Sequence, residues 1–146
     1  IEDSYVVTER VLRALFNALF DHNVLLEGTI LKASMIIPGK DCPQQADVEE
    51  VADFTVQCLK SAVPAALPGI VFLSGGQSDD DATAHLNEMN KAENLPWPLS
   101  FSYGRAMQSA ALKIWGADIA NNFAEAQKTV YARAKDNGLA AKGEWQ

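Results

Sequence analysis

Three short apolar segments alternate with helical patterns along this chain of 146 residues. The strand candidates lie within Val24–Ile37, at Gly69–Leu73 and at Leu99–Phe101, where aliphatic, β-branched and aromatic residues gather. Proline, glycine or serine follows each of them. Strands that alternate with helices predict βαβ units, and therefore an α/β fold with a parallel sheet.

Five segments carry the spacing of helices. In the first, apolar residues recur on one stripe, namely Val7, Val11, Leu12, Leu15, Ala18 and Leu19. Asp47, with Glu50 three residues later, has the pattern of a capping box, and Pro64 stops the helix that it opens. The predicted helices are Ser4–Asp21, the segment from Asp47 to Pro64, Asp79–Met89, Ala106–Trp115 and Asn122–Asp136.

Three parallel strands make a poor sheet by themselves. Both outer strands would have an unpaired edge, and apolar strands with bare edges aggregate. We therefore interpret residues 1–146 as part of a larger sheet.

Charge and cysteine content exclude several classes of protein. The formal net charge of −7 argues against a nucleic-acid-binding protein, which would show a basic face. No apolar run approaches the roughly 20 residues that cross a bilayer, so we expect no membrane partner. Cys42 and Cys58 do not form a disulfide framework, which favours a reducing compartment, with the cytoplasm as the default.

Lys32 lies in the middle of an otherwise apolar strand candidate. If it points inward, desolvation disfavours the charged ammonium, and the neutral amine is the form that attacks a carbonyl to give a Schiff base. The alternative is a structural lysine near a strand end, whose head group reaches water.

Two glycine-containing turns follow the next two strands. Ser74-Gly75-Gly76 and Ser102-Tyr103-Gly104-Arg105 each lead from a strand into a helix, where free N–H groups favour an anion. The guanidinium of Arg105 also fits a phosphate. A plain tight turn and a surface arginine are the alternatives.

The order of the three sites narrows the function. In TIM barrels the chemistry lies at the carboxyl ends of the strands, and the loops after strands seven and eight commonly hold phosphate. A candidate amine nucleophile followed by two anion-binding turns therefore predicts an imine-forming enzyme that acts on a phosphorylated carbonyl compound. His85 lies within a predicted helix with no second ligand nearby, so we expect no metal there.

Three segments closely resemble the class I fructose-bisphosphate aldolases: Leu26–Lys32 (LEGTILK), Phe72–Ser78 (FLSGGQS) and Phe101–Ala106 (FSYGRA). The VTERVL of the first helix and the closing AAKG are similar too, so the likeness covers nearly the whole chain. The resemblance implies that residues 1–146 are the C-terminal portion of a single (β/α)8 TIM-barrel domain, with about strands six to eight and their flanking helices.

The resemblance also implies roles for individual residues. Lys32 matches the Schiff-base lysine; Ser74 and Gly75 match the loop for the ketose-end phosphate; Ser102, Gly104 and Arg105 match the other phosphate-contacting loop. The family cleaves fructose 1,6-bisphosphate reversibly to dihydroxyacetone phosphate and glyceraldehyde 3-phosphate, in glycolysis and gluconeogenesis. It uses no metal or other cofactor and is usually a homotetramer.

Two alternatives stay open at this point. Another Schiff-base aldolase, such as a transaldolase or a deoxyribose-phosphate aldolase, shares the chemistry, although two anion-binding loops favour a substrate with two phosphates. The paired glutamates of the resembling family have no counterpart in these residues. The chain could therefore be a catalytically incomplete module that binds a phosphorylated ligand or a protein.

Overall fold

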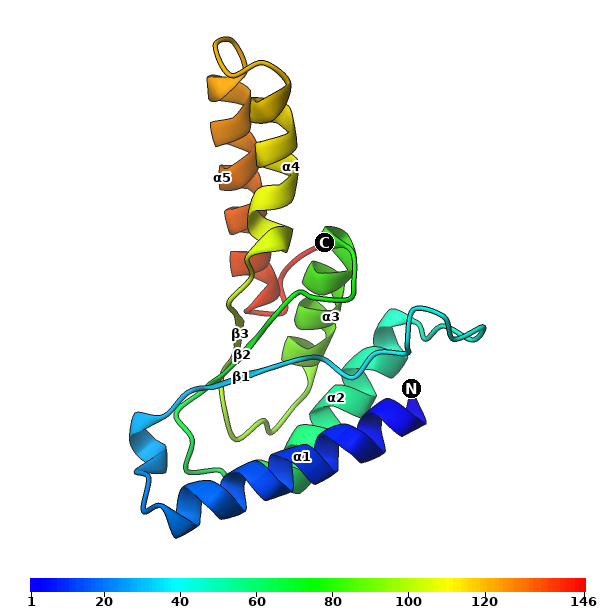
Figure 1. Ribbon diagram of the computed structural model, residues 1–146, viewed down its shortest axis with the longest axis vertical. Helices are drawn as coiled ribbons and strands as arrows, with labels where there is room; N and C mark the ends of the chain where they lie inside the picture. Colours follow the sequence, from blue (N-terminus) through cyan, green and yellow to red (C-terminus); the bar gives the residue numbers. More distant parts are fainter.

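A computed structural model describes all residues from 1 to 146. Its centre is a three-stranded parallel sheet in the order β1 (Leu31–Ala33), β2 (Ile70–Phe72) and β3 (Leu99–Phe101) (Figure 1). The predicted α/β class and parallel sheet are confirmed, and the third strand has the bounds that its sequence predicts.

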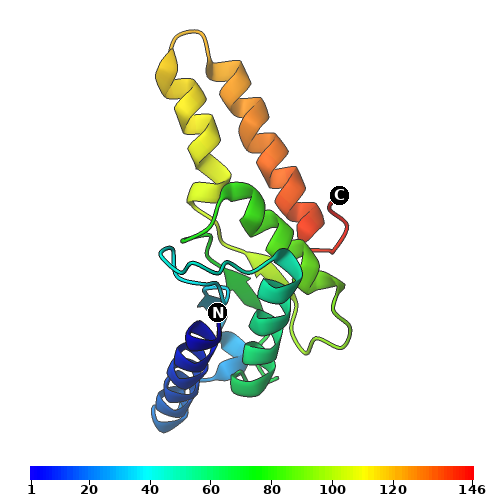
Figure 2. The same cartoon turned by 90° about the vertical axis from the view of Figure 1, so that its right-hand side faces the viewer.

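Helices precede, connect and follow the strands. Their bounds are α1, Glu2–Asp21; α2, Val48–Ala62; α3, Asp79–Lys91; α4, Arg105–Ala117; and α5, Phe123–Ala140. Figures 1 and 2 show α1 beside α2 at one end of the molecule, while α4 and α5 form an antiparallel hairpin that projects from the other end. All five predicted helices are present, and their ends differ from prediction by a few residues.

The central strand is the most deeply buried element. Ile70 and Phe72 of β2 have no exposed surface, and neither do Leu86 and Met89 of α3. A parallel sheet is normally covered by helices, and its strands read as continuous apolar runs for that reason. The core of this chain therefore lies between the sheet and the helices that connect its strands.

Side-chain caps define where two of these helices begin. The carboxylate of Asp47 accepts a hydrogen bond from the Glu50 N–H at 2.9 Å, and the Ser78 hydroxyl accepts one from the Asp81 N–H at 3.0 Å. Each bond satisfies an N–H that the first helical turn leaves without a partner. Ser78 matters for the site below, because it ends the turn after β2.

The segment Val24–Ile37 is less regular than its composition predicts. Only Leu31–Ala33 pairs as a strand, and Leu26–Gly28 forms a 3-10 turn instead. The reason is that β1 has one neighbour, β2, and that neighbour contributes only three paired residues before its own turn. Aliphatic composition alone does not set the length of a strand without a partner to match.

Helix α1 buries a narrower face than predicted. Leu12 and Phe16 are buried, whereas Val7, Val11 and Leu15 are exposed.

The outer edges of β1 and β3 lack a strand partner. None of the helices combines the length and apolar character that a membrane span requires.

We predict that Phe72→Ala lowers the free energy of unfolding by roughly 3–5 kcal/mol, because it leaves a cavity beneath the central strand. Phe20, on α1, is 82% exposed and supplies a matched control, for which about 0.5 kcal/mol or less is expected. Urea unfolding followed by circular dichroism measures both. Equal losses for the two variants would show that β2 is not the centre of the core.

Candidate active site

The parallel register brings the carboxyl ends of the strands to one side of the sheet. Lys32 lies opposite Val71 of β2, which in turn lies opposite Ser100 of β3. Across the sheet, the Nζ atom of Lys32 donates a hydrogen bond to the Ser102 hydroxyl at 3.1 Å. Two predicted site residues that are 70 positions apart in the chain are therefore in direct contact.

Lys32 is exposed rather than enclosed by the apolar residues that flank it. Its neighbours Met35 and Ile36 are buried, but Ile30 is 63% exposed. Of the two alternatives for Lys32, the exposed position is therefore the one observed, and β1 is an outer strand of the sheet. The amine is nevertheless held in place by Ser102.

The turn after β2 is closely packed. Ser74 is buried, and its hydroxyl lies 3.4 Å from the N–H of Ala106 as a hydrogen-bond acceptor. A side chain at Gly75 would approach the Arg105 guanidinium to 3.1 Å, and Gly76 has a φ of +90°, which favours glycine. The glycines therefore allow this turn to approach the second one.

A buried side chain attaches the turn after β3 to helix α3. The buried Tyr103 hydroxyl donates a hydrogen bond to the Ala82 carbonyl at 2.8 Å, which fixes the turn to α3. Burial raises the pKa of Tyr103, so its hydroxyl keeps the proton that it donates. Gly104 and Arg105, which follow, are exposed, and Gly104 has open space where a side chain would lie.

The two turns line one polar hollow of about 380 Å³. Ser74 and Arg105 both contribute to it, so the structure brings the two predicted anion sites together. Lys32 and Ser102 are not among the lining residues. The lining consists of Lys40, Ser74, Gly76, Gln77, Ser78, Asp79, Asp81, Arg105 and Ser109.

Sequence reasoning did not indicate four residues of this hollow, namely Lys40, Asp79, Asp81 and Ser109. Ser109 lies one helical turn after Arg105, and that spacing could have indicated it. Lys40 comes from the loop after β1, and no pattern in the sequence connects it to the other strands. Lys40 and Arg105 are the cations of the hollow, and Asp79 and Asp81 oppose them.

Gln77 links the first turn to two other elements. Its amide nitrogen lies 3.3 Å from the Met35 sulfur, and its amide oxygen lies 2.6 Å from Nδ1 of His85. Because an amide oxygen only accepts, the His85 ring donates from Nδ1. Burial lowers the pKa of His85, with a smaller opposing effect from Asp81, so the histidine is a neutral structural donor.

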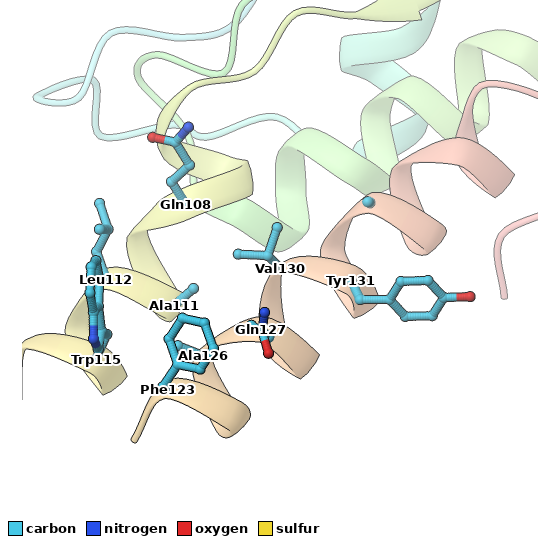
Figure 3. A pocket seen from close by; sticks show the side chains of 10 residues that line it. Gln108, Ala111, Leu112, Trp115, Phe123, Ala126, Gln127, Val130 and Tyr131 are labelled. Atoms are coloured by element: carbon cyan, nitrogen blue, oxygen red, sulfur yellow. The ribbon is translucent and has the colours of Figure 1, made fainter. Parts of the chain in front are cut away.

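An apolar groove of about 560 Å³ lies elsewhere, between α4 and α5 (Figure 3). Leu112, Trp115, Phe123 and Val130 line it, and it contains no charged side chain. Such a groove offers packing but no nucleophile and no anion-binding group. The polar hollow, with Arg105 and Lys40, is therefore the better candidate for binding an anion.

Comparison with known proteins identifies the family. The family model described as "Fructose-bisphosphate aldolase class-I" matches residues 1–146. The chain belongs to the class I fructose-bisphosphate aldolase family. This result confirms the resemblance that the three strand-end segments indicate.

Curated relatives and a solved structure agree with this assignment. The chain is 68% identical over its full length to the probable fructose-bisphosphate aldolase class 1 of Xanthomonas axonopodis and 55% identical over 95% of its length to fructose-bisphosphate aldolase 1 of Toxoplasma gondii. It covers 44% and 38% of these relatives. The aldolase of Plasmodium falciparum, solved with TRAP and a small-molecule inhibitor, is 43% identical, with a TM-score of 0.95 over 99% of this chain and 42% of that one.

The chain thus spans less than half the length of these aldolases, and within that span its fold is the same. The deoxyribose-phosphate aldolase and transaldolase alternatives are accordingly set aside. The architecture agrees with part of a TIM barrel.

The stability of this region should depend on pH through His85. Its folded pKa lies below the ordinary value of 6.5, so the unfolded chain binds a proton first and stability falls as pH drops below about 6.5. Asp81, and Asp47 in the same pocket, are the nearby acids and remain in the variant His85→Asn. Asparagine keeps a donor near the position of Nδ1 but does not titrate.

Urea unfolding of both proteins from about pH 8 to about pH 5 measures the effect. We expect a constant stability difference above the ordinary histidine pKa, and below it a steeper decline for the unmodified chain. Parallel curves throughout would contradict a buried neutral His85.

Proposed function

We propose that this chain supplies the Schiff-base lysine and the phosphate-binding loops of a fructose-bisphosphate aldolase. The reaction is the reversible cleavage of fructose 1,6-bisphosphate to dihydroxyacetone phosphate and glyceraldehyde 3-phosphate. Membership of the class I family and the contact between Lys32 and the Ser102 loop carry the proposal. The function belongs to the whole enzyme, of which the chain spans less than half the length in its relatives.

Lys32 acts as the nucleophile in this proposal. Its neutral amine attacks the C2 carbonyl, and loss of water leaves a protonated imine. When the C3–C4 bond breaks, its electron pair moves into the imine as an enamine, and the C4 hydroxyl gives up its proton as the aldehyde leaves. Protonation of C3 and hydrolysis of the imine then release dihydroxyacetone phosphate and restore Lys32.

We assign the acid and the base for these proton transfers to parts of the whole enzyme other than residues 1–146, since the relatives are more than twice as long as this chain. Ser102, the side chain in contact with Lys32, is a hydroxyl that orients the amine. A neutral hydroxyl is a weak base, so Ser102 is not assigned the role of proton acceptor. No metal or other cofactor takes part in the proposed mechanism.

The loop residues grip phosphate in the proposal. Ser74 and Gly75 contribute from the first turn, and Ser102, Gly104 and Arg105 contribute from the second. Since both turns line one hollow, the geometry favours a single phosphate held by both loops over two separate phosphates. The positive charge of Arg105, with that of Lys40, provides the attraction.

We assign the three strands to positions six, seven and eight of a (β/α)8 barrel, with residues 1–146 as the C-terminal portion of that single domain. The free edges of β1 and β3 support this assignment, because a closed barrel pairs both of them. Barrel closure would also cover the open side of β1 and place Lys32 in the interior.

Assembly and location follow the family in this proposal. We assign the enzyme a homotetrameric state, supported by the exposed Val6, Val7 and Val11 on α1, which resemble an interface more than a solvated face. A cytoplasmic location is supported by the Arabidopsis thaliana relative named "Fructose-bisphosphate aldolase 5, cytosolic", which is 51% identical. The alternative, a catalytically incomplete module, would bind the phosphorylated ligand without cleaving it.

Replacing the nucleophile tests the function. In the full-length protein that carries this chain, Lys32→Met should lower kcat for fructose 1,6-bisphosphate by at least about 1,000-fold, because no imine can form. Lys113→Met removes an exposed lysine from α4 and should leave kcat unchanged. A coupled assay for glyceraldehyde 3-phosphate measures both, and an inactive unmodified enzyme would favour the binding module.

Removing the guanidinium tests the phosphate grip. Arg105→Ala should weaken binding of dihydroxyacetone phosphate by roughly 10- to 100-fold, the worth of a hydrogen bond to a charged group. Binding of uncharged dihydroxyacetone should change little. Affinities from competition in the cleavage assay decide the matter, and equal losses for both ligands would refute the assigned role.

A further inference from the structure

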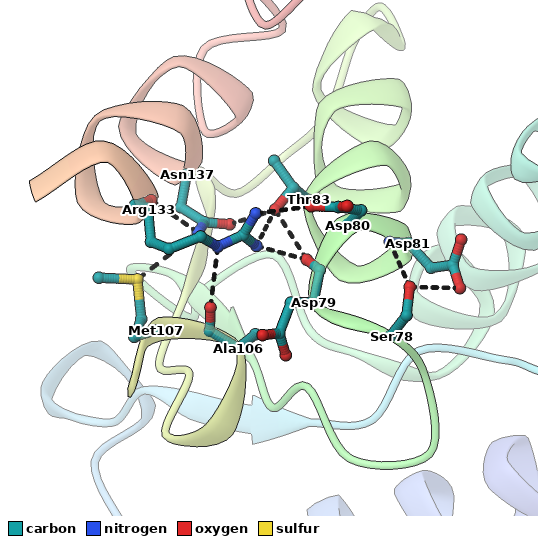
Figure 4. Close-up of polar contacts among 9 residues, drawn as sticks. All are labelled: Ser78, Asp79, Asp80, Asp81, Thr83, Ala106, Met107, Arg133 and Asn137. Atoms are coloured by element: carbon teal, nitrogen blue, oxygen red, sulfur yellow. Dashed lines mark hydrogen bonds and ion pairs between the residues drawn. The ribbon is translucent and has the colours of Figure 1, made fainter. Parts of the chain in front are cut away.

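Arg133 of α5 makes polar contacts to two other helices with one guanidinium (Figure 4). Its Nε atom donates to the Ala106 carbonyl at 3.0 Å, and its Nη1 atom lies 2.8 Å from the Asp80 carboxylate. Its Nη2 atom donates to the Thr83 hydroxyl at 2.8 Å and to the Asp79 carbonyl. The side chain is only 11% exposed.

The contacted residues share a position in the fold. Asp79, Asp80 and Thr83 belong to the start of α3, directly after the turn that follows β2. Ala106 belongs to the first turn of α4, directly after the turn that follows β3. Arg133 therefore joins the two helix starts that carry the two loops of the polar hollow.

We propose that Arg133 is a positioning residue that fixes the separation of the two phosphate-binding loops. The inference rests on the proposed function, since it takes the hollow between those loops as the phosphate site. Arg133 does not line the hollow, so it acts through the backbone of α3 and α4 rather than by touching the ligand. It is absent from the residues that the sequence indicates as functional.

The second polar residue of α5 supports this role. Asn137, one turn after Arg133, has no exposed surface. Its amide nitrogen donates to the Arg133 carbonyl at 2.8 Å, and its amide oxygen accepts from Thr83 at 3.0 Å. Arg133, Thr83 and Asn137 thus form one connected network in which every buried side-chain polar atom has a partner.

The shape of the Arg133 guanidinium matters more for this network than its ion pair with Asp80. The Asp80 side chain is 84% exposed, and ion pairs with an exposed partner stabilise a protein little. The bonds to the two backbone carbonyls start from two different nitrogens, Nε and Nη2, which the planar guanidinium holds apart, whereas an ammonium has all its donors on one nitrogen. A lysine at position 133 would keep the charge but could not reach both helices.

A comparison of two ligands on the full-length protein tests the proposal. Dihydroxyacetone phosphate and uncharged dihydroxyacetone are each trapped on the enzyme with borohydride, and the half-saturating concentration is measured. Arg133→Met should raise this concentration for the phosphorylated ligand by at least about tenfold, because a displaced loop loses its grip. Trapping of the uncharged ligand should change by less than about twofold, because Lys32 lies outside the network.

Two further variants separate positioning from general stability. Arg133→Lys should also raise the half-saturating concentration for the phosphorylated ligand and not for the uncharged one. This variant tests the proposal if Arg133→Met does not fold. Arg13→Met removes an exposed arginine that pairs with Glu9 on α1, and both ligands should then behave as in the unmodified protein. Thermal melting of every variant reports on folding independently.

The possible results lead to different conclusions. Equal losses for the two ligands, or an unchanged phosphorylated ligand in either Arg133 variant, would overturn the positioning role while leaving the aldolase function intact. An unmodified protein that traps neither ligand would instead overturn the proposed function, and the role of Arg133 with it.

Discussion

The parallel register of three strands is the constraint on which the rest of this structure depends. Because β1, β2 and β3 run in the same direction, all three end on the same side of the sheet. Lys32 of β1 and Ser102, just after β3, therefore lie within hydrogen-bonding distance of each other. With an antiparallel neighbour, one of the loops would lie at the opposite end of the sheet, away from Lys32.

The helices give the strand ends their rigidity. Each turn after β2 and β3 leads directly into a helix, so the position of a loop depends on where its helix begins. Tyr103 fixes the second turn to α3, and Arg133 fixes the starts of α3 and α4 to α5. Loops that bind a small anion keep their geometry through packing of this kind, at residues that never contact the ligand.

Local sequence patterns predicted much of this fold, but they did not predict the features that depend on contacts between distant parts of the chain. Helix caps at Asp47 and the strand–glycine–helix turns are local, so spacing alone reveals them. Burial of Lys32 depends on neighbouring strands that pair with β1, and no local pattern reports whether they are present. Lys40 and Arg133 were missed for a related reason, since their roles come from contacts across distant parts of the chain.

A crystal structure of the full-length protein after borohydride reduction with dihydroxyacetone phosphate tests the central claim most directly. The account predicts a ligand bonded through its former carbonyl carbon to Nζ of Lys32, with its phosphate in the hollow against Ser74 and Arg105. A ligand attached to another lysine, or a phosphate that lies away from both loops, would contradict it.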